Sequence, residues 1–405
     1  MNASFTPISD GTVTSPQGFM AGAVCSGASD TPEDRLGVGI LYSEVPCVAA
    51  GVFTTNRIKA APVVLSQKHL VNRQAQAVVV NSGCANACCG ERGYADAAEM
   101  ATLAAGKLGI AFEDLVVAST GRIGMPLPME RVRAGIEKIA VVRGGGRELA
   151  EAIMTTDTFP KGIAMAVDAG EARFTIGGIA KGAGMIHPDL ATMLCFLATD
   201  GAVDSDFIKV ALKEAVDASF NMITVDGDNS PNDTVVILAN GLVGGEVLRA
   251  GTTGGEAFQA ALGEVCLYLA KCIARDGEGA TKLIEVTVDG ALTVGDARLA
   301  ARTIAGSSLV KAAVHGCEPN WGRIVAALGR SEVEGVESRV DLYLDNICLT
   351  KAGCPLPFDE GEAIAALSKA EVPIRLHLNL GREKATAWGC DLSEEYVTLN
   401  SSSLT

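Results

Sequence analysis

Residues 181–194 read KGAGMIHPDLATML, a glycine-punctuated turn that runs into an abruptly apolar segment. Gly182 and Gly184 permit backbone conformations that other residues resist. His187 precedes Pro188, and the residue before a proline is biased toward extended geometry. A segment of this composition can hold a peptide bond in a strained conformation. The sequence therefore predicts a turn that presents Thr192 where the apolar run opens.

Two interpretations of Thr192 follow from these residues. In the first, strain favours attack of the Thr192 hydroxyl on the Ala191 carbonyl, which gives an ester that water opens. The freed α-amine of Thr192, with an ordinary pKa near about 7.7–8.0, then serves as general base toward its own hydroxyl. In the second, Thr192 is a buried threonine with a satisfied hydroxyl, beside an ordinary turn. The pattern alone leaves both open.

The composition is that of a compact protein with an acidic surface. At 405 residues the chain is long enough for two or three domains, with 48% hydrophobic and 20% charged residues. The 46 glycines and 4% aromatic residues indicate a core of small and aliphatic side chains. A net charge of −15 with interspersed signs shows no basic face. We therefore expect neither nucleic acid nor a membrane as a partner.

No apolar segment approaches the roughly 20 residues that span a bilayer, and MNASFTPISDGTV lacks the layout of a secretion signal. A cytoplasmic location is therefore expected. Most of the twelve cysteines are scattered singly, which favours buried thiols over disulfides. The cluster of Cys84, Cys88 and Cys89 has no nearby histidine and no second CxxC, so we expect no zinc or other metal. The four histidines are not paired, and no GxSxG motif accompanies them.

Hydrophobic periodicity predicts alternating strands and helices. Residues 37–44 and 47–56 are expected to be two strands separated by a turn that contains Pro46. Helical spacing predicts helices in five segments, 94–109, 129–140, 147–155, 204–220 and 256–283. Beyond about residue 283, strand-like segments, 385–400 among them, alternate with helical patterns. This shift indicates a smaller α+β domain.

The stretch 181–194 resembles the processing and active-site segment of the ornithine acetyltransferase family, the glutamate N-acetyltransferases of arginine biosynthesis. Further stretches resemble signatures of that family in the same order, GVFTTNRIKAAPV (51–63), VVVNSGCANACCGERG (78–93), TTDTFPK (155–161), VDGDNSPNDT (225–234), RDGEGATK (275–282) and HGCEPNWGRI (315–324). The likeness covers nearly the whole chain. Cys84 and Cys89 stand where asparagine and threonine are expected, and Glu318 stands where aspartate is common. For the two cysteines we expect altered packing rather than lost chemistry.

The resemblance implies a role for each of several residues. Cleavage falls between Ala191 and Thr192, and Thr192 is the nucleophile. An oxyanion hole is supplied by Thr120 and Gly121, in a segment that would otherwise be a plain strand-to-loop connection. Substrate contacts are implied for six residues, Thr155, Lys181, Thr192, Glu278, Asn400 and Thr405. Thr156 is the near rival of Thr155, and without the family context Lys181 and Glu278 would be expected at the surface.

The same resemblance implies an architecture, an αββα-type sandwich in residues 1–285 and a smaller α+β domain in 286–405 whose tail closes the active site. The precursor splits into an α chain, 1–191, and a β chain from residue 192. The chains assemble as a heterotetramer of two α and two β chains. The implied reaction is ping-pong transfer of an acetyl group from N2-acetyl-L-ornithine to L-glutamate through acetyl-Thr192. No metal or redox cofactor is needed.

Several alternatives stay open at the level of sequence. Acetyl-CoA as an additional donor would make the enzyme bifunctional, and no separate motif decides this. An aminopeptidase or amidase of related fold would use the same N-terminal nucleophile but give the acyl group to water. A non-catalytic binding protein of the same fold, or a paralogue that serves another pathway, would carry similar signatures.

Overall fold

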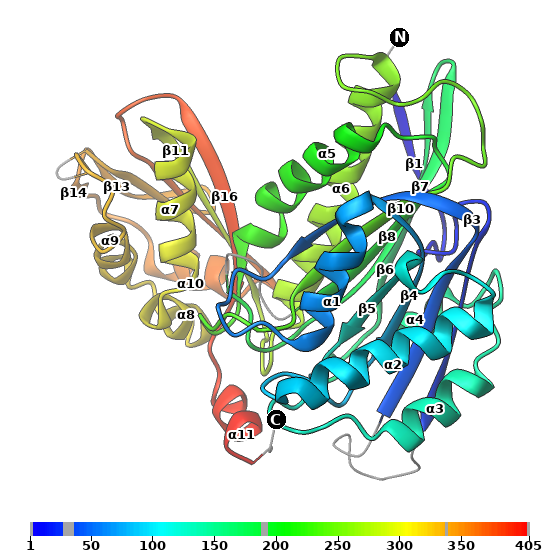
Figure 1. The fold of residues 1–405 in the computed structure, drawn as a ribbon. Helices are drawn as coiled ribbons and strands as arrows, with labels where there is room; N and C mark the ends of the chain where they lie inside the picture. Colours follow the sequence, from blue (N-terminus) through cyan, green and yellow to red (C-terminus); the bar gives the residue numbers. More distant parts are fainter. Residues whose placement is uncertain (1–2, 27–35, 188–192, 337–338, 403–405) are drawn as a thin grey trace.

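The structure is a computed structural model that describes residues 3–26, 36–187, 193–336 and 339–402 (Figure 1). Ala191, Thr192 and Thr405 lie outside these residues. The strands form two sheets, one of nine strands and one of seven. In Figure 1 the larger sheet, with α1–α6, lies to the right of the smaller sheet and its helices.

The nine-stranded sheet has the order β1-β6-β7-β8-β10-β3-β4-β5, and β2 also pairs with β3. Its strands are β1 (Ser4–Pro7), β2 (Phe19–Ser26), β3 (Leu36–Phe53), β4 (Gln74–Asn81), β5 (Leu115–Ser119), β6 (Lys161–Ala169), β7 (Ala172–Lys181), β8 (Leu194–Thr199) and β10 (Thr234–Ala239). The pairing of β7 with β8 is antiparallel, and that of β8 with β10 is parallel.

The strand β3 joins the two halves of this sheet. One half consists of β1, β6, β7, β8 and β10, and the other of β2, β4 and β5. Its first part pairs with β2 and β4, and its last part pairs with β10. The prediction of two separate strands divided by a turn at Pro46 was wrong, because the chain continues as one strand through this proline. The register with β4 shifts between Tyr42 and Cys47, and a proline is tolerated at such an irregularity.

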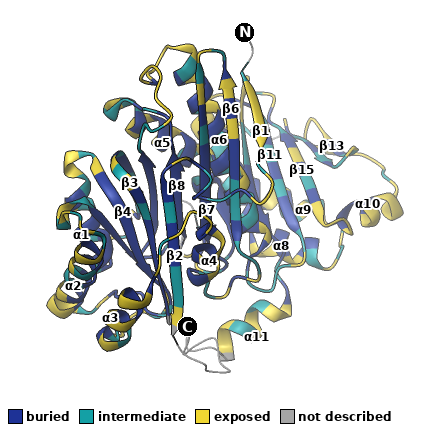
Figure 2. Ribbon diagram, turned by 90° about the vertical axis from the view of Figure 1, so that its right-hand side faces the viewer, coloured by how far each residue is buried: buried dark blue, intermediate teal, exposed yellow. Residues whose placement is uncertain are grey.

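Alternating side chains show that the two halves stack as layers. Along β4 and β8, every second residue enters one shared core between the halves, namely Val78, Val80, Leu194, Phe196 and Ala198. The intervening residues point outward and pack against helices, Ala77 and Val79 with α2 and α3, and Cys195 and Leu197 with α5 and α6. Figure 2 shows the strands largely buried and exposed residues gathered on the outer helices. The expected αββα sandwich is therefore confirmed.

One helix layer consists of α1 (Ala61–His69), α2 (Gly90–Leu108) and α3 (Met129–Lys138), and α4 (Gly146–Ala152) packs beside β2. The opposite layer consists of α5 (Ser205–Ala218) and α6 (Thr253–Arg275). Capping side chains begin two of these helices, and a glycine ends a third. The Asp204 carboxylate accepts the first free N–H groups of α5, Thr252 does the same for α6, and Gly109 ends α2 at φ 68°.

The helix α6 also differs from one sequence expectation. It is long and apolar enough to cross a membrane by length and composition, although no such segment was expected. However, 56% of the most apolar 18-residue stretch of this helix is buried within the protein. Phe258, Leu262 and Leu269 on this helix belong to the largest core cluster. These are the properties of a core helix, and the feature is weak evidence for anything else.

The seven-stranded sheet has the order β14-β13-β12-β15-β11-β16-β9. Its strands are β9 (Ile223–Thr224), β11 (Leu283–Ala291), β12 (Asp341–Leu344), β13 (Ile347–Lys351), β14 (Cys354–Pro355), β15 (Glu371–His377) and β16 (Glu383–Cys390). The accompanying helices are α7 (Val294–Ala305), α8 (Ser308–His315), α9 (Trp321–Gly329) and α10 (Glu360–Leu367). The division of the chain at residue 285 stays a prediction.

The C-terminal tail differs from its expected structure. Residues 385–400 were predicted to be strand-like throughout, but β16 ends at Cys390 and residues Glu394–Ser402 form the helix α11. The Ser393 hydroxyl donates to the carbonyl of Gly279 at 2.6 Å just before this helix. Tertiary contact of this kind overrides a short and ambiguous local pattern.

Candidate active site

Lys181 lies at the end of β7 and is 2% exposed. Its Nζ donates a hydrogen bond to Thr155 Oγ1 at 2.8 Å. The structure thus brings together two predicted substrate contacts that are far apart in the sequence. Thr156, the rival of Thr155, is exposed. This placement favours Thr155, whose role as a substrate contact stays a prediction.

A buried carboxylate lies beneath this pair. Asp157 accepts the N–H of Gly182 at 2.7 Å and the Nζ of Lys161 at 2.7 Å on one oxygen, and the N–H of Thr155 at 3.1 Å on the other. Its second oxygen lies 3.8 Å from Lys181 Nζ. Burial alone would raise the pKa of Asp157, but Lys181, Lys161 and the Gly182 N–H lower it to about 2. Asp157 is therefore an anion at neutral pH.

Burial and neighbouring charges together lower the pKa of Lys181. Burial lowers the pKa of its ammonium, and the positive charge of Lys161 lowers it further. The carboxylates of Asp157, Glu278 and Asp233 raise it. These carboxylates offset part of the cost of burying the Lys181 ammonium, and a buried group with a shifted pKa marks a candidate functional site.

Glu278 approaches the same segment from the loop after α6. Its backbone N–H donates to the Ala183 carbonyl at 2.9 Å. Its Oε2 accepts a hydrogen bond from Asn400 Nδ2 at 2.8 Å, which ties the loop to α11. A methyl group added to Gly184 would lie only 2.4 Å from Glu278 Oε1. The carboxylate therefore rests directly against the turn that precedes residue 192.

The predicted oxyanion turn follows β5. Thr120 is buried, and its backbone N–H donates to the Asn81 carbonyl at 3.0 Å. Gly121 has φ 128°, and a Cβ there would lie 2.3 Å from the carbonyl carbon of Gly83 and 2.5 Å from the nitrogen of Cys84. Only glycine fits such a close approach of two backbone segments. The role of this turn as an oxyanion hole stays a prediction.

Two adjacent residues of the VDGDNSPNDT signature connect this turn to the segment after residue 192. Asn232 Nδ2 donates to the carbonyls of Ala85 at 2.6 Å and Ser119 at 2.8 Å. Asp233 Oδ1 accepts the N–H of Met193 at 3.0 Å. Burial raises the pKa of Asp233 well above its ordinary value, although the Met193 N–H and the charge of Lys181 lower it. The oxyanion turn, the residue after Thr192 and Lys181 are thus linked through this pair.

Four residues beneath the site were not predicted from the sequence. Asp157, Asp233 and Asp276 all lie within quoted signatures, and Lys161 ends one of them, yet none was assigned a role. Lys161 Nζ bridges Asp157 at 2.7 Å and Asp276 at 2.5 Å. Aspartates inside signatures were a usable signal, but no sequence pattern pairs residues as distant as 157 and 276.

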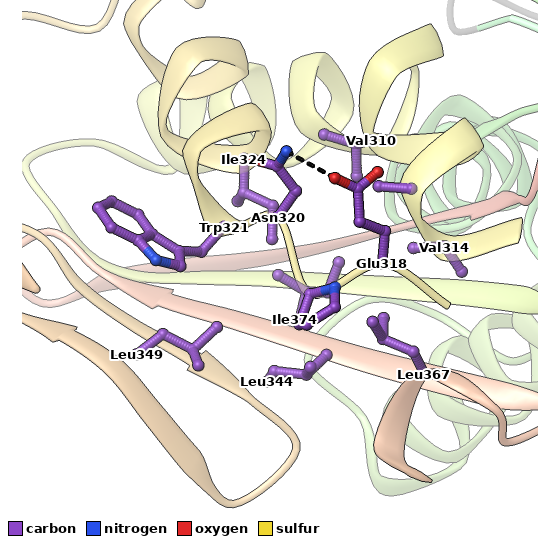
Figure 3. Close-up of a pocket in the computed structure, with 12 residues that line it drawn as sticks. Val310, Val314, Glu318, Asn320, Trp321, Ile324, Leu344, Leu349, Leu367 and Ile374 are labelled. Carbon is purple, nitrogen blue, oxygen red and sulfur yellow. Dashed lines mark hydrogen bonds between the residues drawn. The ribbon is translucent and has the colours of Figure 1, made fainter. Parts of the chain in front are cut away.

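A cavity of about 20 Å³ lies elsewhere, between α8, α9 and the second sheet (Figure 3). Apolar side chains such as Ile324, Leu344 and Ile374 line most of it. Within the HGCEPNWGRI signature, Glu318 accepts a hydrogen bond from Asn320 Nδ2 at 3.0 Å, as Figure 3 shows. The cavity holds little more than a water molecule, so it cannot bind an amino acid.

Metal-binding side chains do not cluster in the described part of the chain. Across the described ranges, 3–26, 36–187, 193–336 and 339–402, no group of three or more histidine, cysteine, aspartate or glutamate side chains is placed to bind one. The thiols of Cys84 and Cys89 instead both donate to the Met125 carbonyl, each at 3.1 Å. Beside the predicted oxyanion turn, these two residues therefore contribute packing and hydrogen bonds.

Known proteins resemble this chain over most of its length. The ArgJ family profile matches residues 21–405. An "arginine biosynthesis bifunctional protein ArgJ" from Symbiobacterium thermophilum is 55% identical over 97% of this chain and 98% of its own, and one from Dehalococcoides mccartyi is 50% identical over 99% of each. A crystal structure of the Bacillus halodurans protein of that name is 43% identical, with a TM-score of 0.50, over 50% of this chain and 96% of its own. The chain therefore belongs to the ArgJ family of arginine-biosynthesis enzymes.

Proposed function

We propose that this enzyme cuts itself between Ala191 and Thr192 and then transfers an acetyl group from N2-acetyl-L-ornithine to L-glutamate through Thr192. The observation that carries the proposal is the pairing of a buried cation and a carboxylate around one turn. Lys181 and Glu278 flank residues 182–184, upstream of the predicted cut. These opposite charges match an amino acid, which presents a carboxylate and an ammonium group.

Lys181 binds the substrate carboxylate, and Glu278 binds the substrate ammonium. Thr155 lies beside the Lys181 ammonium and accepts a hydrogen bond from it. Asn400 orients the Glu278 carboxylate from the C-terminal helix. Thr405, in the same tail, is proposed as a further contact that helps to close the site. Charge-assisted hydrogen bonds of this kind fix both the orientation and the class of ligand.

Catalysis proceeds in two half-reactions. The Thr192 hydroxyl loses its proton to the Thr192 α-amine and attacks the acetyl carbonyl of the donor. The Thr120 hydroxyl and the Gly121 N–H stabilise the tetrahedral oxyanion, the C–N bond breaks, and ornithine leaves with the transferred proton. The α-amine of glutamate then attacks acetyl-Thr192, which releases N-acetylglutamate and restores the hydroxyl. The residues that perform these steps come from the enzyme, and no metal or redox cofactor is required.

Two broader features belong to the proposal. The curated relatives carry the word bifunctional in their names, which supports acetyl-CoA as a second acetyl donor to glutamate. The matched chain of the Bacillus halodurans structure corresponds to half of this one, a length that suits one fragment of a processed precursor. We further propose that the fragments assemble as two α and two β chains, which sedimentation of the purified enzyme tests.

Denaturing mass spectrometry tests the cut. The purified protein is expected to yield fragments of residues 1–191 and 192–405, and Thr192→Ala is expected to remain whole. After incubation with N2-acetylornithine alone, the second fragment is expected to gain the mass of one acetyl group. A wild-type chain that stays intact while fully active would refute the proposal.

Product analysis distinguishes the transferase from a hydrolase. With N2-acetylornithine and glutamate together, N-acetylglutamate is expected to appear in step with ornithine. Without glutamate, ornithine release is expected to stop after about one turnover per site, as ping-pong transfer requires. Continuous release of acetate without glutamate would instead identify an amidase. The same assay with acetyl-CoA in place of acetylornithine tests the second donor.

A further inference from the structure

Lys161 lies at the start of β6 and is 1% exposed. Its Nζ donates to Asp157 Oδ1 at 2.7 Å, to Asp276 Oδ2 at 2.5 Å and to the Phe159 carbonyl at 3.4 Å. An ammonium group has three N–H donors, so these three acceptors engage it fully. Lys161 therefore has no donor left for a ligand.

Lys181 uses fewer of its hydrogen-bond donors than Lys161 does. Within the described part of the chain its Nζ makes one hydrogen bond, to Thr155 Oγ1 at 2.8 Å. The nearest Asp157 oxygen lies 3.8 Å from it, beyond hydrogen-bond distance. Two buried lysines thus pair with the same carboxylate, and of the two only Lys161 is within hydrogen-bond distance of it.

The reason lies in how Asp157 is shared. Its Oδ1 is taken by Lys161 and by the Gly182 N–H, and its Oδ2 is taken by the Thr155 N–H. A shift of about 1 Å would bring Lys181 to ordinary charge-assisted hydrogen-bond distance from Oδ2. Lys161 neutralises Asp157 and so weakens the attraction that would draw Lys181 onto it.

Asp276 holds Lys161 in this position from the other side. The N–H of Thr158 donates to Asp276 Oδ2 at 3.0 Å, and the Thr158 hydroxyl also bonds this carboxylate. Asp276 itself is buried just beyond the end of α6. It is therefore a fixed second anion that competes with Asp157 for Lys161 but does not contact Lys181.

We propose that Lys161 is a positioning residue which, by engaging Asp157, keeps the Lys181 ammonium uncommitted for the carboxylate of the amino-acid substrate. This inference rests on the proposed binding role of Lys181. It assigns Lys161 no contact with substrate. Its effect on the reaction passes entirely through Asp157 and Lys181.

Two charge-matched double variants test the inference. Lys161→Met with Asp276→Asn leaves Asp157 as the buried anion beside Lys181, so the two are expected to pair. Lys161→Met with Asp157→Asn leaves Asp276 instead, and Lys181 is expected to stay free. Both variants lose one positive and one negative charge, so they have the same net charge. Thermal unfolding and the extent of self-cleavage are measured for both before kinetics.

The KM for glutamate is expected to be about tenfold or more higher in the variant that keeps Asp157 than in the one that keeps Asp276. The kcat values are expected to agree within about threefold. In a Lys181→Met background the difference between the two variants is expected to disappear, because residues that act through one group are not additive. A merely structural role would raise KM similarly in both variants.

The outcomes separate this inference from the proposed function. If Lys181→Met leaves the KM for glutamate unchanged, the proposed binding role of Lys181 is wrong. If Lys181→Met raises KM but the two double variants have equal KM values, only the role of Lys161 is overturned. A KM difference that persists in the Lys181→Met background also overturns it, because the effect then does not pass through Lys181.

Discussion

Replacing Gly184 with alanine is expected to impair substrate binding while sparing the fold. The three atoms nearest to an added Cβ all belong to the Glu278 carboxyl group, with Oε1 at 2.4 Å, Cδ at 2.5 Å and Oε2 at 2.6 Å. Ordinary van der Waals contact begins at about 3.4 Å. The backbone of Gly184 does not occupy the left-handed region, so alanine is compatible with it. The substitution therefore acts first on the Glu278 carboxyl group.

The distances set the size of the effect. The Glu278 carboxyl must retreat by about 1 Å, and this is cheap in folding terms because it is the far end of a flexible side chain. A displacement of about 1 Å in a binding group can cost on the order of 100-fold in rate. We expect kcat/KM for both amino-acid substrates to fall by about 10- to 100-fold. The melting temperature is expected to change by no more than a few degrees.

Steady-state kinetics and thermal unfolding of the variant check this expectation. Gly263→Ala is the matched control, because a Cβ at this helical glycine meets nothing within 4 Å. That change is expected to leave kcat/KM unaltered and to stabilise α6 by about 0.5–1 kcal/mol. If Gly184→Ala keeps kcat/KM within twofold of the wild-type value, the position of Glu278 does not govern substrate binding and the reasoning fails.

Three further substitutions test other parts of the site. Thr120→Val is expected to lower kcat by about 10²- to 10³-fold with little change in KM. If the variant and the wild type have comparable kcat values, the Thr120 hydroxyl is not part of the oxyanion hole. Gly121→Ala is expected to prevent stable folding, because its Cβ would lie 2.3 Å from the Gly83 backbone at φ 128°, and a soluble variant with wild-type melting would contradict this. Asp157→Asn is expected to cost about 3–5 kcal/mol at pH 7 by leaving Lys161 under-paired. Since the pKa of Asp157 is lowered to about 2, its contribution is complete above about pH 4 and is lost as pH falls toward 2. Urea unfolding across this range is expected to show a larger loss of stability in the wild type than in the variant, and parallel curves would refute it.

Much of the fold follows from local patterns in the sequence. Helical spacing over residues 94–109 predicted α2, and Gly109 ends that helix in the left-handed conformation as expected. The αββα layers were implied by family resemblance, and alternating burial along β4 and β8 confirms them. The wrong predictions concern segments whose secondary structure depends on contacts with distant parts of the chain. Pro46 lies within β3 because the register shifts there, and residues 394–402 are helical next to a loop that holds them.

The candidate site was predictable in part, and its missing members share one property. Lys181, Glu278 and Asn400 stand at motif positions, and the structure connects the latter two directly. Lys161 and Asp276, in contrast, are meaningful only as partners of each other and of Asp157. A buried lysine is costly unless its charge is paired, but sequence alone does not reveal its burial or the partner 115 residues away. Such networks become visible only when the chain is folded.

The topology also explains why a cut at residue 191 would not release the two fragments. On the N-terminal side of the predicted cut, Asp226 accepts the N–H groups of Met185 at 2.6 Å and Ile186 at 2.9 Å. On the C-terminal side, Asp233 accepts the N–H of Met193, and the Met193 carbonyl accepts the N–H of Thr234 at 3.1 Å. The flanks are thus anchored independently of the bond between them. Because β7 and β8 pair along six residues of one buried sheet, the fragments can separate only if that sheet unfolds. A new N-terminus created at this position therefore stays beside the strand ends that carry the site, and this is what a nucleophile generated by cleavage requires.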